Sequence, residues 1–322
     1  MRGRSRKGRP INGWIVVDKG QGITSTEVVA RIKRLSDAQK VGHGGTLDPL
    51  ATGVLPIAMG EATKTVAYVM DASKEYDFTM RFGEARDTDD AAGAVVRSSD
   101  LRPSDAAIRE ALPRFVGTIS QVPPTYAAVK VQGERAYDLA RRGEVVELQA
   151  REVRIDELAL TGRPDADHAS FRMVCGKGAY VRAIARDLGE LLGCHAHVSD
   201  LRRTRVGAFR VEDAVTLDAF TEMAAEETWP QVIVPVATAL AGIPALAVTE
   251  PQAIRLRAGQ SIRVPPQLIT GEAAVAEGCT VRAMRAGELV ALLRLEEEGE
   301  LAPLRVFHPA TAAQQPRPPG QP

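Results

Sequence analysis

The chain has 322 residues, which is long enough for one large domain and a smaller one. Apolar residues make up 44% and charged residues 25%, ordinary values for a soluble globular protein. Lys plus Arg and Asp plus Glu both number 41, so overall charge gives no argument for nucleic-acid binding, and any basic surface must be local.

The cysteines Cys175, Cys194 and Cys279 are too few for a disulfide framework and indicate a reducing compartment. No apolar run is long enough to span a membrane, and the N-terminus lacks the apolar core of a signal peptide. We therefore expect a cytoplasmic protein. Cys194, His195 and His197 could bind a metal, but no CxxC pair or second cluster completes a set of four. We expect a buried thiol and two surface imidazoles there, and no metal.

The chain opens with a basic arm, for which a phosphate contact and a plain solubilising role are equally compatible. Its cations are Arg2, Arg4, Arg6, Lys7 and Arg9. A short buried strand is then expected at Trp14–Val17, ending at Asp18–Lys19. Thr24 and Glu27 form a capping-box pattern, which predicts a helix start there. The following helix should bury the face that carries Val28, Ile32 and Leu35.

The glycine-rich stretch from Val41 to Lys64 has one aspartate, Asp48, near its centre. Because the residue before a proline is pushed out of the helical region, Pro49 keeps Asp48 extended or in a turn. Local chemistry alone favours a tight turn in which Asp48 only bonds nearby backbone N–H groups. A P-loop is not indicated, because no Gly-Lys-Ser/Thr ending follows.

Beyond this loop, apolar and polar residues alternate from Tyr76 to Phe82, which predicts a strand with one buried face. On this pattern Tyr76 is a core aromatic at a strand end. The acidic stretch from Glu84 to Gly93 is expected to be a solvated turn region. Ser104 should cap the next helix.

A third helix is predicted between Gly176 and Gly193, with Gly193 placed to end it. Arg186 is explained by a salt-bridged surface that includes Glu190, four residues further on. Arg182 lies in the first helical turn, where a cation opposes the helix dipole, so it should find a partner elsewhere. Leucine and clustered cations follow at 201–205 and could meet phosphates.

The sequence pattern changes near residue 249, where short β-rich segments alternate with glycine turns, as in a small barrel. These segments are 261–264, 279–284, 289–295 and 304–307. The acidic run 296–300 does not suit an RNA-facing surface. Residues from 310 onward are rich in Pro, Gln and Ala, so we expect disorder there.

Several of these segments resemble the TruB family of tRNA pseudouridine synthases. The stretch GGTLDPLATGVLPIAMGEATK resembles the catalytic motif of that family, and VDKGQGITSTEVV resembles its first motif. SKEYDF, VPPTYAAVKVQGERAYDLA and GKGAYVRAIARDLGELLG match further family segments. The resemblance implies that Asp48 is the nucleophile, that Tyr76 lies against the target base and serves as a base, and that Arg182 pairs with Asp48. The implied substrate-binding residues are Lys19, His43, Lys64, Lys130, Tyr180, Leu201 and Arg202.

The resemblance implies an α+β pseudouridine synthase fold, with a mixed, largely antiparallel central sheet flanked by helices and a small C-terminal β-rich domain similar to a PUA domain. We expect a basic flexible arm at 1–10, a catalytic domain at 11–245, the PUA-like domain at 246–309 and a disordered tail at 310–322.

The implied activity is isomerisation of uridine-55 in the T-arm of tRNA, with base flipping and without a cofactor. The expected partner is the tRNA T-stem-loop, and the protein is expected to be a monomer. Whether the aspartate attacks the ribose, promotes glycal formation or attacks the uracil stays open. One alternative is an RNA-binding or chaperone protein that assists tRNA folding, a role that could coexist with catalysis. The other is a nucleoside hydrolase, which usually needs a second carboxylate near the first.

Overall fold

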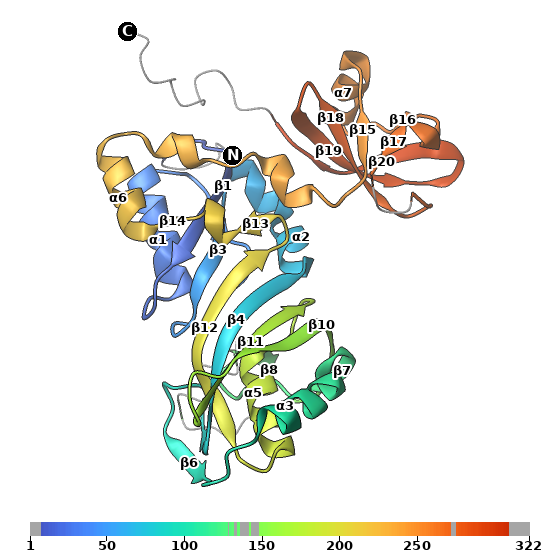
Figure 1. The fold of residues 1–322 in the computed structure, drawn as a ribbon. Coiled ribbons are helices and arrows are strands. Elements are labelled where there is room, and N and C mark those ends of the chain that lie inside the picture. Colours follow the sequence, from blue (N-terminus) through green and yellow to red (C-terminus); the bar gives the residue numbers. More distant parts are fainter. Residues whose placement is uncertain are drawn as a thin grey trace.

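The computed structural model describes residues 8–127, 129–131, 134–135, 142, 148–271 and 275–308, and the description below covers these residues. Most strands belong to two separate sheets, one of ten strands and one of six (Figure 1). The expected fold class is confirmed: helices flank a large mixed sheet, and a smaller β-rich unit follows. Among the described residues, no helix combines the length and apolar character needed to cross a membrane.

The large sheet has the strand order β14-β1-β3-β12-β4-β11-β10-β7, with β2 on β3 and β13 on β12. Neighbours are antiparallel except for the parallel pairs β1–β14 and β3–β12. Its strands are β1 (Gly13–Lys19), β2 (Val41–His43), β3 (Thr52–Met59), β4 (Lys74–Phe82), β7 (Gly117–Gln121), β10 (Arg151–Gly162), β11 (His168–Cys175), β12 (Ala196–Val206), β13 (Phe209–Arg210) and β14 (Val215–Thr216). Two short hairpins pair β5 (Glu84–Arg86) with β6 (Val95–Ser98) and β8 (Lys130–Val131) with β9 (Glu134–Arg135).

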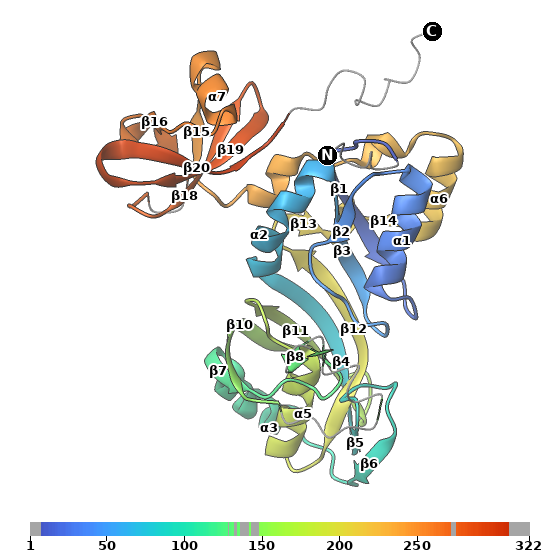
Figure 2. The same cartoon turned by 180° about the vertical axis from the view of Figure 1, so that it is seen from behind.

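The long curved strands β4 and β12 join the two ends of this sheet (Figure 1). Helices α1 and α6 lie beside β1 and β14 at one end, and α3 and α5 lie at the other (Figure 2). The helices are α1 (Ser25–Ser36), α2 (Val66–Asp71), α3 (Asp105–Ala111), α5 (Val181–Leu191) and α6 (Leu217–Ala225). Short 3-10 turns are η1 (Gly60–Thr65), η2 (Leu112–Phe115), η3 (Val211–Asp213), η4 (Trp229–Val232) and η5 (Val236–Leu240).

The local signals explain where these elements begin and end. The capping box of Thr24 and Glu27 starts α1, and the Ser104 hydroxyl accepts from a backbone N–H at the start of α3. Gly193 takes a φ of +69° directly after α5, the left-handed conformation that ends helices and suits glycine. The alternation predicted for β4 is present, since Phe78, Met80 and Phe82 are buried.

The smaller sheet has the order β16-β20-β19-β18-β15-β17 and its own buried core. Its elements are β15 (Ala245–Ala247), α7 (Glu250–Arg257), β16 (Ile262–Arg263), η6 (Pro266–Leu268), β17 (Ile269–Thr270), β18 (Thr280–Arg285), β19 (Glu288–Leu295), η7 (Glu297–Gly299) and β20 (Glu300–Val306). It contacts the larger unit through Phe307 and Leu292, which pack with Leu240.

Part of the N-terminal arm expected at 1–10 is packed against the rest of the chain. Arg9 makes a backbone bridge to Ala38, and its guanidinium lies 5.9 Å from the ring centroid of Trp229. The end of the expected arm therefore packs on the large unit. Residues 1–7 and the expected tail from 310 lie outside the described residues, as does most of the segment 128–147.

Candidate active site

Asp48 lies in the loop that joins β2 to β3, and a serine of α1 fixes this loop. The Ser25 hydroxyl accepts a hydrogen bond from the Leu47 N–H at 2.9 Å and donates to the Leu47 carbonyl oxygen at 3.0 Å. Ser25 follows the helix cap Thr24, and the Leu47 side chain is buried in the main core. The backbone immediately before Asp48 is therefore anchored through both its polar groups and its side chain.

Two buried cations bond the same loop from β1 and β12, the strands on either side of β3. Lys19, at the end of β1, donates to three backbone carbonyl oxygens, including that of Pro49 at 3.3 Å. Burial lowers the pKa of the Lys19 ammonium to about 8, although the nearby Asp48 carboxylate opposes this shift. Arg203 of β12 is 2% exposed. Its guanidinium donates to the carbonyl oxygens of Val54, Thr46 and Gly45.

The Asp48 carboxylate forms an ion pair with Arg182, the second residue of α5. Its Oδ2 lies 2.9 Å from the arginine Nε. The Arg182 side chain is 4% exposed and that of Asp48 is 35% exposed, so the cation is buried and the carboxylate remains accessible. The two Nη atoms of Arg182 donate to the carbonyl oxygens of Thr88 and Tyr126, both at 2.9 Å. The expected partner of Asp48 is thus present, in a fixed position.

The acidic stretch 84–93 is not the solvated turn that we expected. Asp90 is 6% exposed, and its Oδ2 lies 3.7 Å from the Nε of Arg182. Its carboxylate also accepts from the Thr88 hydroxyl at 2.7 Å and the Ala92 N–H at 3.0 Å. The stretch therefore supplies acceptors to the buried Arg182 guanidinium, which needs them in place of water.

The expected surface pairing of Arg186 with Glu190 is also wrong. Arg186 lies 3.0 Å from Asp89 and 2.8 Å from Asp187. Burial raises the pKa of the Asp89 carboxyl to about 6, against the opposing effect of the Arg186 guanidinium. Both arginines of α5 thus hold the acidic stretch in place.

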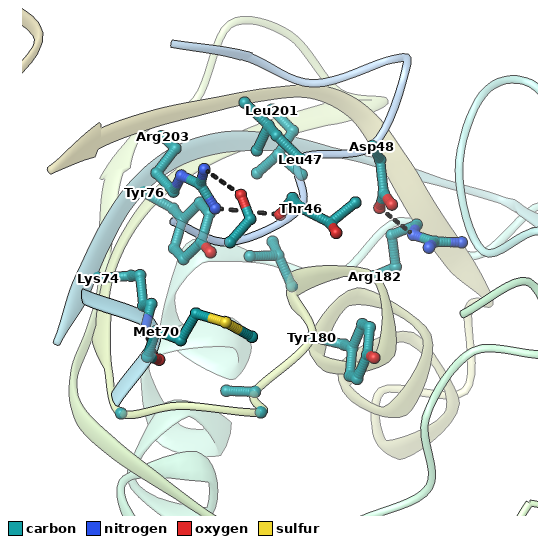
Figure 3. A pocket seen from close by; sticks show the side chains of 15 residues that line it. Thr46, Leu47, Asp48, Met70, Lys74, Tyr76, Tyr180, Arg182, Leu201 and Arg203 are labelled. Carbon is teal, nitrogen blue, oxygen red and sulfur yellow. Dashed lines mark hydrogen bonds and ion pairs between the residues drawn. The ribbon is translucent and has the colours of Figure 1, made fainter. Parts of the chain in front are cut away.

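A cavity of about 230 Å³ opens beside Asp48 (Figure 3). It lies between the Asp48 loop, β4, β12 and the N-terminal end of α5. Besides loop and backbone atoms, its walls include Asp48, Met70, Lys74, Tyr76, Tyr180, Arg182, Leu201 and Arg203. Drug-sized ligands usually occupy pockets of roughly 300–1,000 Å³, so this cavity suits a smaller group.

Two tyrosines form part of the cavity wall. The backbone N–H and carbonyl of Tyr180 bond the side-chain amide of Gln121, at 2.9 and 3.2 Å. Burial raises the pKa of both the Tyr180 and the Tyr76 hydroxyl. The Asp48 carboxylate adds to this shift for Tyr180, and the Arg203 guanidinium opposes it for Tyr76. Both phenols are therefore neutral in the resting site.

Half of the site residues expected from the sequence meet at this cavity. These are Asp48, Tyr76, Tyr180, Arg182 and Leu201. They come from four separate parts of the chain, so only the folded sheet brings them together.

Four of the other expected residues, Lys19, His43, Lys64 and Arg202, are absent from the described lining of the cavity. Lys19 bonds the loop at the Pro49 carbonyl oxygen. His43 lies on β2, and its Nδ1 is 3.4 Å from the backbone nitrogen of Gly45. Lys64 donates to a carbonyl oxygen of β20 at 2.8 Å, and Arg202 pairs with a carboxylate of β1 at 2.7 Å. The backbone of Lys130 lies in β8, but its side chain is outside the described residues.

Two cations of the cavity wall, Lys74 and Arg203, were missing from the predicted site. Successive residues of a strand point to opposite faces, so residues two apart share a face. Lys74 is two residues before Tyr76, and Arg203 is two residues after Leu201. This spacing could have identified both, and it also separates Arg203 from Arg202.

No group of three or more His, Cys, Asp or Glu side chains in the described ranges is placed to hold a metal. Cys194 is buried, as expected. His197 is also buried, not on the surface, and its Nδ1 lies 3.0 Å from the Glu84 carbonyl oxygen. The His195 ring faces Glu190 at 3.0 Å. These side chains therefore have local partners.

An accessible carboxylate, a fixed countercharge and a small cavity walled in part by two tyrosines suit nucleophilic catalysis on a small substrate group. Two family models match consecutive parts of the chain. The TruB family pseudouridylate synthase (N terminal domain) model matches residues 33–181, and the tRNA pseudouridylate synthase B C-terminal domain model matches residues 182–241. The fold and the site thus define a pseudouridylate synthase, an isomerase.

Comparisons over almost the whole chain agree. The tRNA pseudouridine synthase B of Gluconacetobacter diazotrophicus is 52% identical over 306 residues, covering 94% of this chain and 100% of the relative. That of Bradyrhizobium diazoefficiens is 52% identical over 308 residues, covering 94% and 88%. The chain belongs to the TruB family.

Solved structures share the fold. An H/ACA ribonucleoprotein bound to a substrate RNA containing 2′-deoxyuridine has a chain that is 26% identical, with a TM-score of 0.73 and coverage of 95% of this chain and 91% of that one. A Cbf5-Nop10-Gar1 complex has a chain that is 27% identical, with a TM-score of 0.72 and the same coverage.

Proposed function

We propose that this protein converts uridine-55 in the T-arm of tRNA into pseudouridine, with Asp48 as the nucleophile. The relatives that match almost the whole chain are named tRNA pseudouridine synthases, which supports tRNA as the substrate. The observation that carries the catalytic assignment is the accessible Asp48 carboxylate, held 2.9 Å from the buried Arg182 beside the cavity.

The target uridine must leave the folded tRNA before it can reach Asp48. Enzymes that act on a base in structured nucleic acid extrude the nucleotide into a pocket and hold the base against aromatic or apolar side chains. Tyr76, Tyr180 and Leu201 supply such walls here. The small cavity favours a single flipped base over a longer stretch of RNA.

The Asp48 carboxylate then attacks the ribose C1′ or promotes glycal formation, and the bond from C1′ to uracil N1 breaks. Arg182 supplies the countercharge and keeps the carboxylate facing the cavity. The uracil rotates, its C5 forms the new bond to C1′, and the proton on C5 is lost. The reaction needs no oxidant, reductant or cofactor.

Tyr76 is the proposed base for the C5 proton and a platform for the uracil ring. Its raised pKa keeps the phenol protonated before the reaction. The hydroxyl can therefore accept the C5 proton only if it passes its own proton onward in the same step. Its packing role does not depend on this transfer.

We propose an RNA-binding role for the β-rich unit at 246–309, within a chain that acts as a monomer and also assists tRNA folding. The separate core of this unit supports an appended module. Lys64 would join it to the catalytic unit, since its ammonium bonds β20 and lies 5.6 Å from the ring centroid of Phe307. His43, Lys130 and Arg202 are proposed to contact the tRNA outside the cavity.

Tritium release from a tRNA transcript labelled at uracil C5 tests the catalytic proposal. Asp48→Asn should release no tritium above background while it binds tRNA with an affinity close to that of the wild type. Asp167→Asn is a matched control, because Asp167 also pairs with an arginine Nε, that of Arg102 at 2.5 Å, but is absent from the cavity. This control should keep the wild-type rate.

A second transcript, with cytidine at position 55, tests the target position and should abolish release. Wild-type turnover by Asp48→Asn would refute the nucleophile, and release from the second transcript would refute the position. Tight tRNA binding without release by the wild type would favour the RNA-binding protein.

A further inference from the structure

The two ends of the cavity differ in how their charges are compensated. Asp48 and Arg182 neutralise each other at one end, and Lys74 and Arg203 lie with Tyr76 at the other (Figure 3). Within the described part of the chain, neither Lys74 nor Arg203 has a carboxylate within 4.0 Å. A buried charge without a counterion is costly, so such a pair in a cavity wall indicates an anionic or electron-rich ligand.

Lys74 is 8% exposed and is held at the end of α2. Its ammonium donates to the carbonyl oxygens of Met70 and Ala72, the latter at 2.5 Å. An ammonium has three N–H donors, so these two bonds leave one donor unassigned. Burial lowers the pKa of Lys74 to about 8, and the neighbouring Arg203 charge adds to this shift. Burial and the Arg203 charge thus both disfavour the protonated form of Lys74 in the cavity wall.

Arg203 also has more hydrogen-bond donors than its backbone carbonyl partners use. A guanidinium has five N–H donors, and three bonds to backbone carbonyl oxygens are present. Arg203 also forms a side-chain hydrogen bond to the Tyr76 hydroxyl, and this bond and its charge lower the pKa of that hydroxyl against the effect of burial. Lys74 and Arg203 therefore place two positive charges, each with a donor that no carbonyl oxygen or Tyr76 accounts for, at the cavity end opposite Asp48.

The proposed reaction creates negative charge at that end, and this inference rests on the proposed function. When the bond from C1′ to N1 breaks, its electron pair stays on the uracil, and Asp48 either forms the new bond to C1′ or takes the C2′ proton. The negative charge thus passes from the carboxylate to the detached base, where it spreads over N1 and the carbonyl oxygens. We propose that Lys74 and Arg203 bind the detached uracil as its anion while it rotates.

The remaining steps balance without another reactant. Uracil C5 forms the bond to C1′, and the carboxylate is released again, or regains its charge by returning the proton to C2′. The C5 proton is then lost and N1 gains one, which gives neutral pseudouridine. During rotation the anion stays bound, because a diffusing base would turn the isomerase into a hydrolase.

Lys74→Met tests this proposal in single-turnover reactions with tRNA that carries either uridine or 5-fluorouridine at the target position. Loss of one donor to a developing anion typically lowers a rate roughly 10²–10³-fold. We expect a loss of this order with uridine, measured as tritium release. The loss should be smaller with 5-fluorouridine, measured as its disappearance from nuclease digests, because fluorine stabilises the departing anion. The dissociation constant for tRNA should change little.

Lys33→Met is the matched control, since Lys33 is exposed on α1 and is not part of the cavity wall, and it should match the wild type with both substrates. A purely structural role of Lys74 at the end of α2 predicts the same fractional loss with both substrates. That result, or a Lys74→Met rate within threefold of the wild type, overturns the proposal.

The wild-type pH profile is a second test that does not depend on how a variant folds. The single-turnover rate should fall above about pH 8, where Lys74 and the loop-supporting Lys19 lose their protons, and Lys74→Arg should show a smaller fall, because Lys19 alone then titrates. An equal fall in the wild type and Lys74→Arg contradicts the proposal. A rate that is constant from neutral pH to well above the pKa of Lys74 contradicts the proposal. If the wild type releases no tritium at all, the proposed function itself fails. Release by the wild type with an unaffected Lys74→Met variant refutes only the anion site.

Discussion

Replacing Ser25 by alanine should loosen the catalytic loop without touching the cavity. The substitution removes both hydrogen bonds between the Ser25 hydroxyl and the backbone of Leu47. It also leaves the N–H and carbonyl next to Asp48 without these partners, in a place where Ser25 is only 3% exposed. Water cannot easily replace the lost bonds there.

The size of the effect follows from these two bonds. A typical hydrogen bond contributes about 0.5–1.5 kcal/mol net, so two contribute about 1–3 kcal/mol to the free energy of unfolding. Since about 1.4 kcal/mol corresponds to a factor of ten in rate, the same energy can lower the single-turnover rate by about 5- to 150-fold. The upper value applies if all the lost energy was used to position Asp48.

Ser36→Ala provides a matched control on the same helix. Ser36 is equally buried, but its hydroxyl donates to the Ile32 carbonyl within α1, at 2.7 Å. We expect Ser25→Ala to lower both the urea midpoint and the tritium-release rate, and Ser36→Ala to leave the rate unchanged. A Ser25→Ala enzyme with wild-type rate, or equal rate losses in the two variants, would show that Ser25 does not position Asp48.

Two further predictions concern backbone strain and pH. Gly53→Ala should prevent stable folding, because φ at Gly53 is +100° and the new Cβ would lie 2.2 Å from the Arg203 carbonyl oxygen. Gly22→Ala is the control, since φ is +83° there but nothing lies within reach of the new Cβ. It should lower the free energy of unfolding in urea by only about 1–2 kcal/mol. Equal losses would refute the steric argument. Burial raises the pKa of the Asp89 carboxyl to about 6 in the folded protein, above its usual value of about 4. The native state therefore binds more protons than the unfolded state, and this residue's stabilising contribution falls as pH rises from about 4 to 6. Asp89→Asn should therefore gain up to about 3 kcal/mol relative to the wild type over this range, and a constant difference between their urea-unfolding free energies would contradict the shift.

Much of the local structure was predictable from neighbouring residues. The capping box at Thr24, the alternation of β4 and the helix end at Gly193 each depend on the chemistry of a few adjacent positions. The resemblance to the TruB family implied Asp48 as the nucleophile, and this residue lines the cavity. It also implied the pairing with Arg182 that the structure shows.

The wrong predictions were those that considered only residues close together in the sequence. Glu190 was a plausible partner for Arg186 on one helix face, but Asp89 approaches from a loop 97 residues away. The acidic stretch seemed solvated because charged loops usually are. Its burial depends on α5 packing behind it, which no local pattern records.

The sequence by itself determined the family and most of the elements, because these reside in motifs and periodicities along the chain, and it singled out Asp48 as the proposed nucleophile. Only the tertiary structure decided which cations share the cavity. Arg202 and Arg203 are neighbours in the sequence, yet one pairs with β1 and the other faces Tyr76. The pleat of β12 sends successive side chains to opposite faces, and the register of β12 on β3 and β4 decides which face meets Asp48.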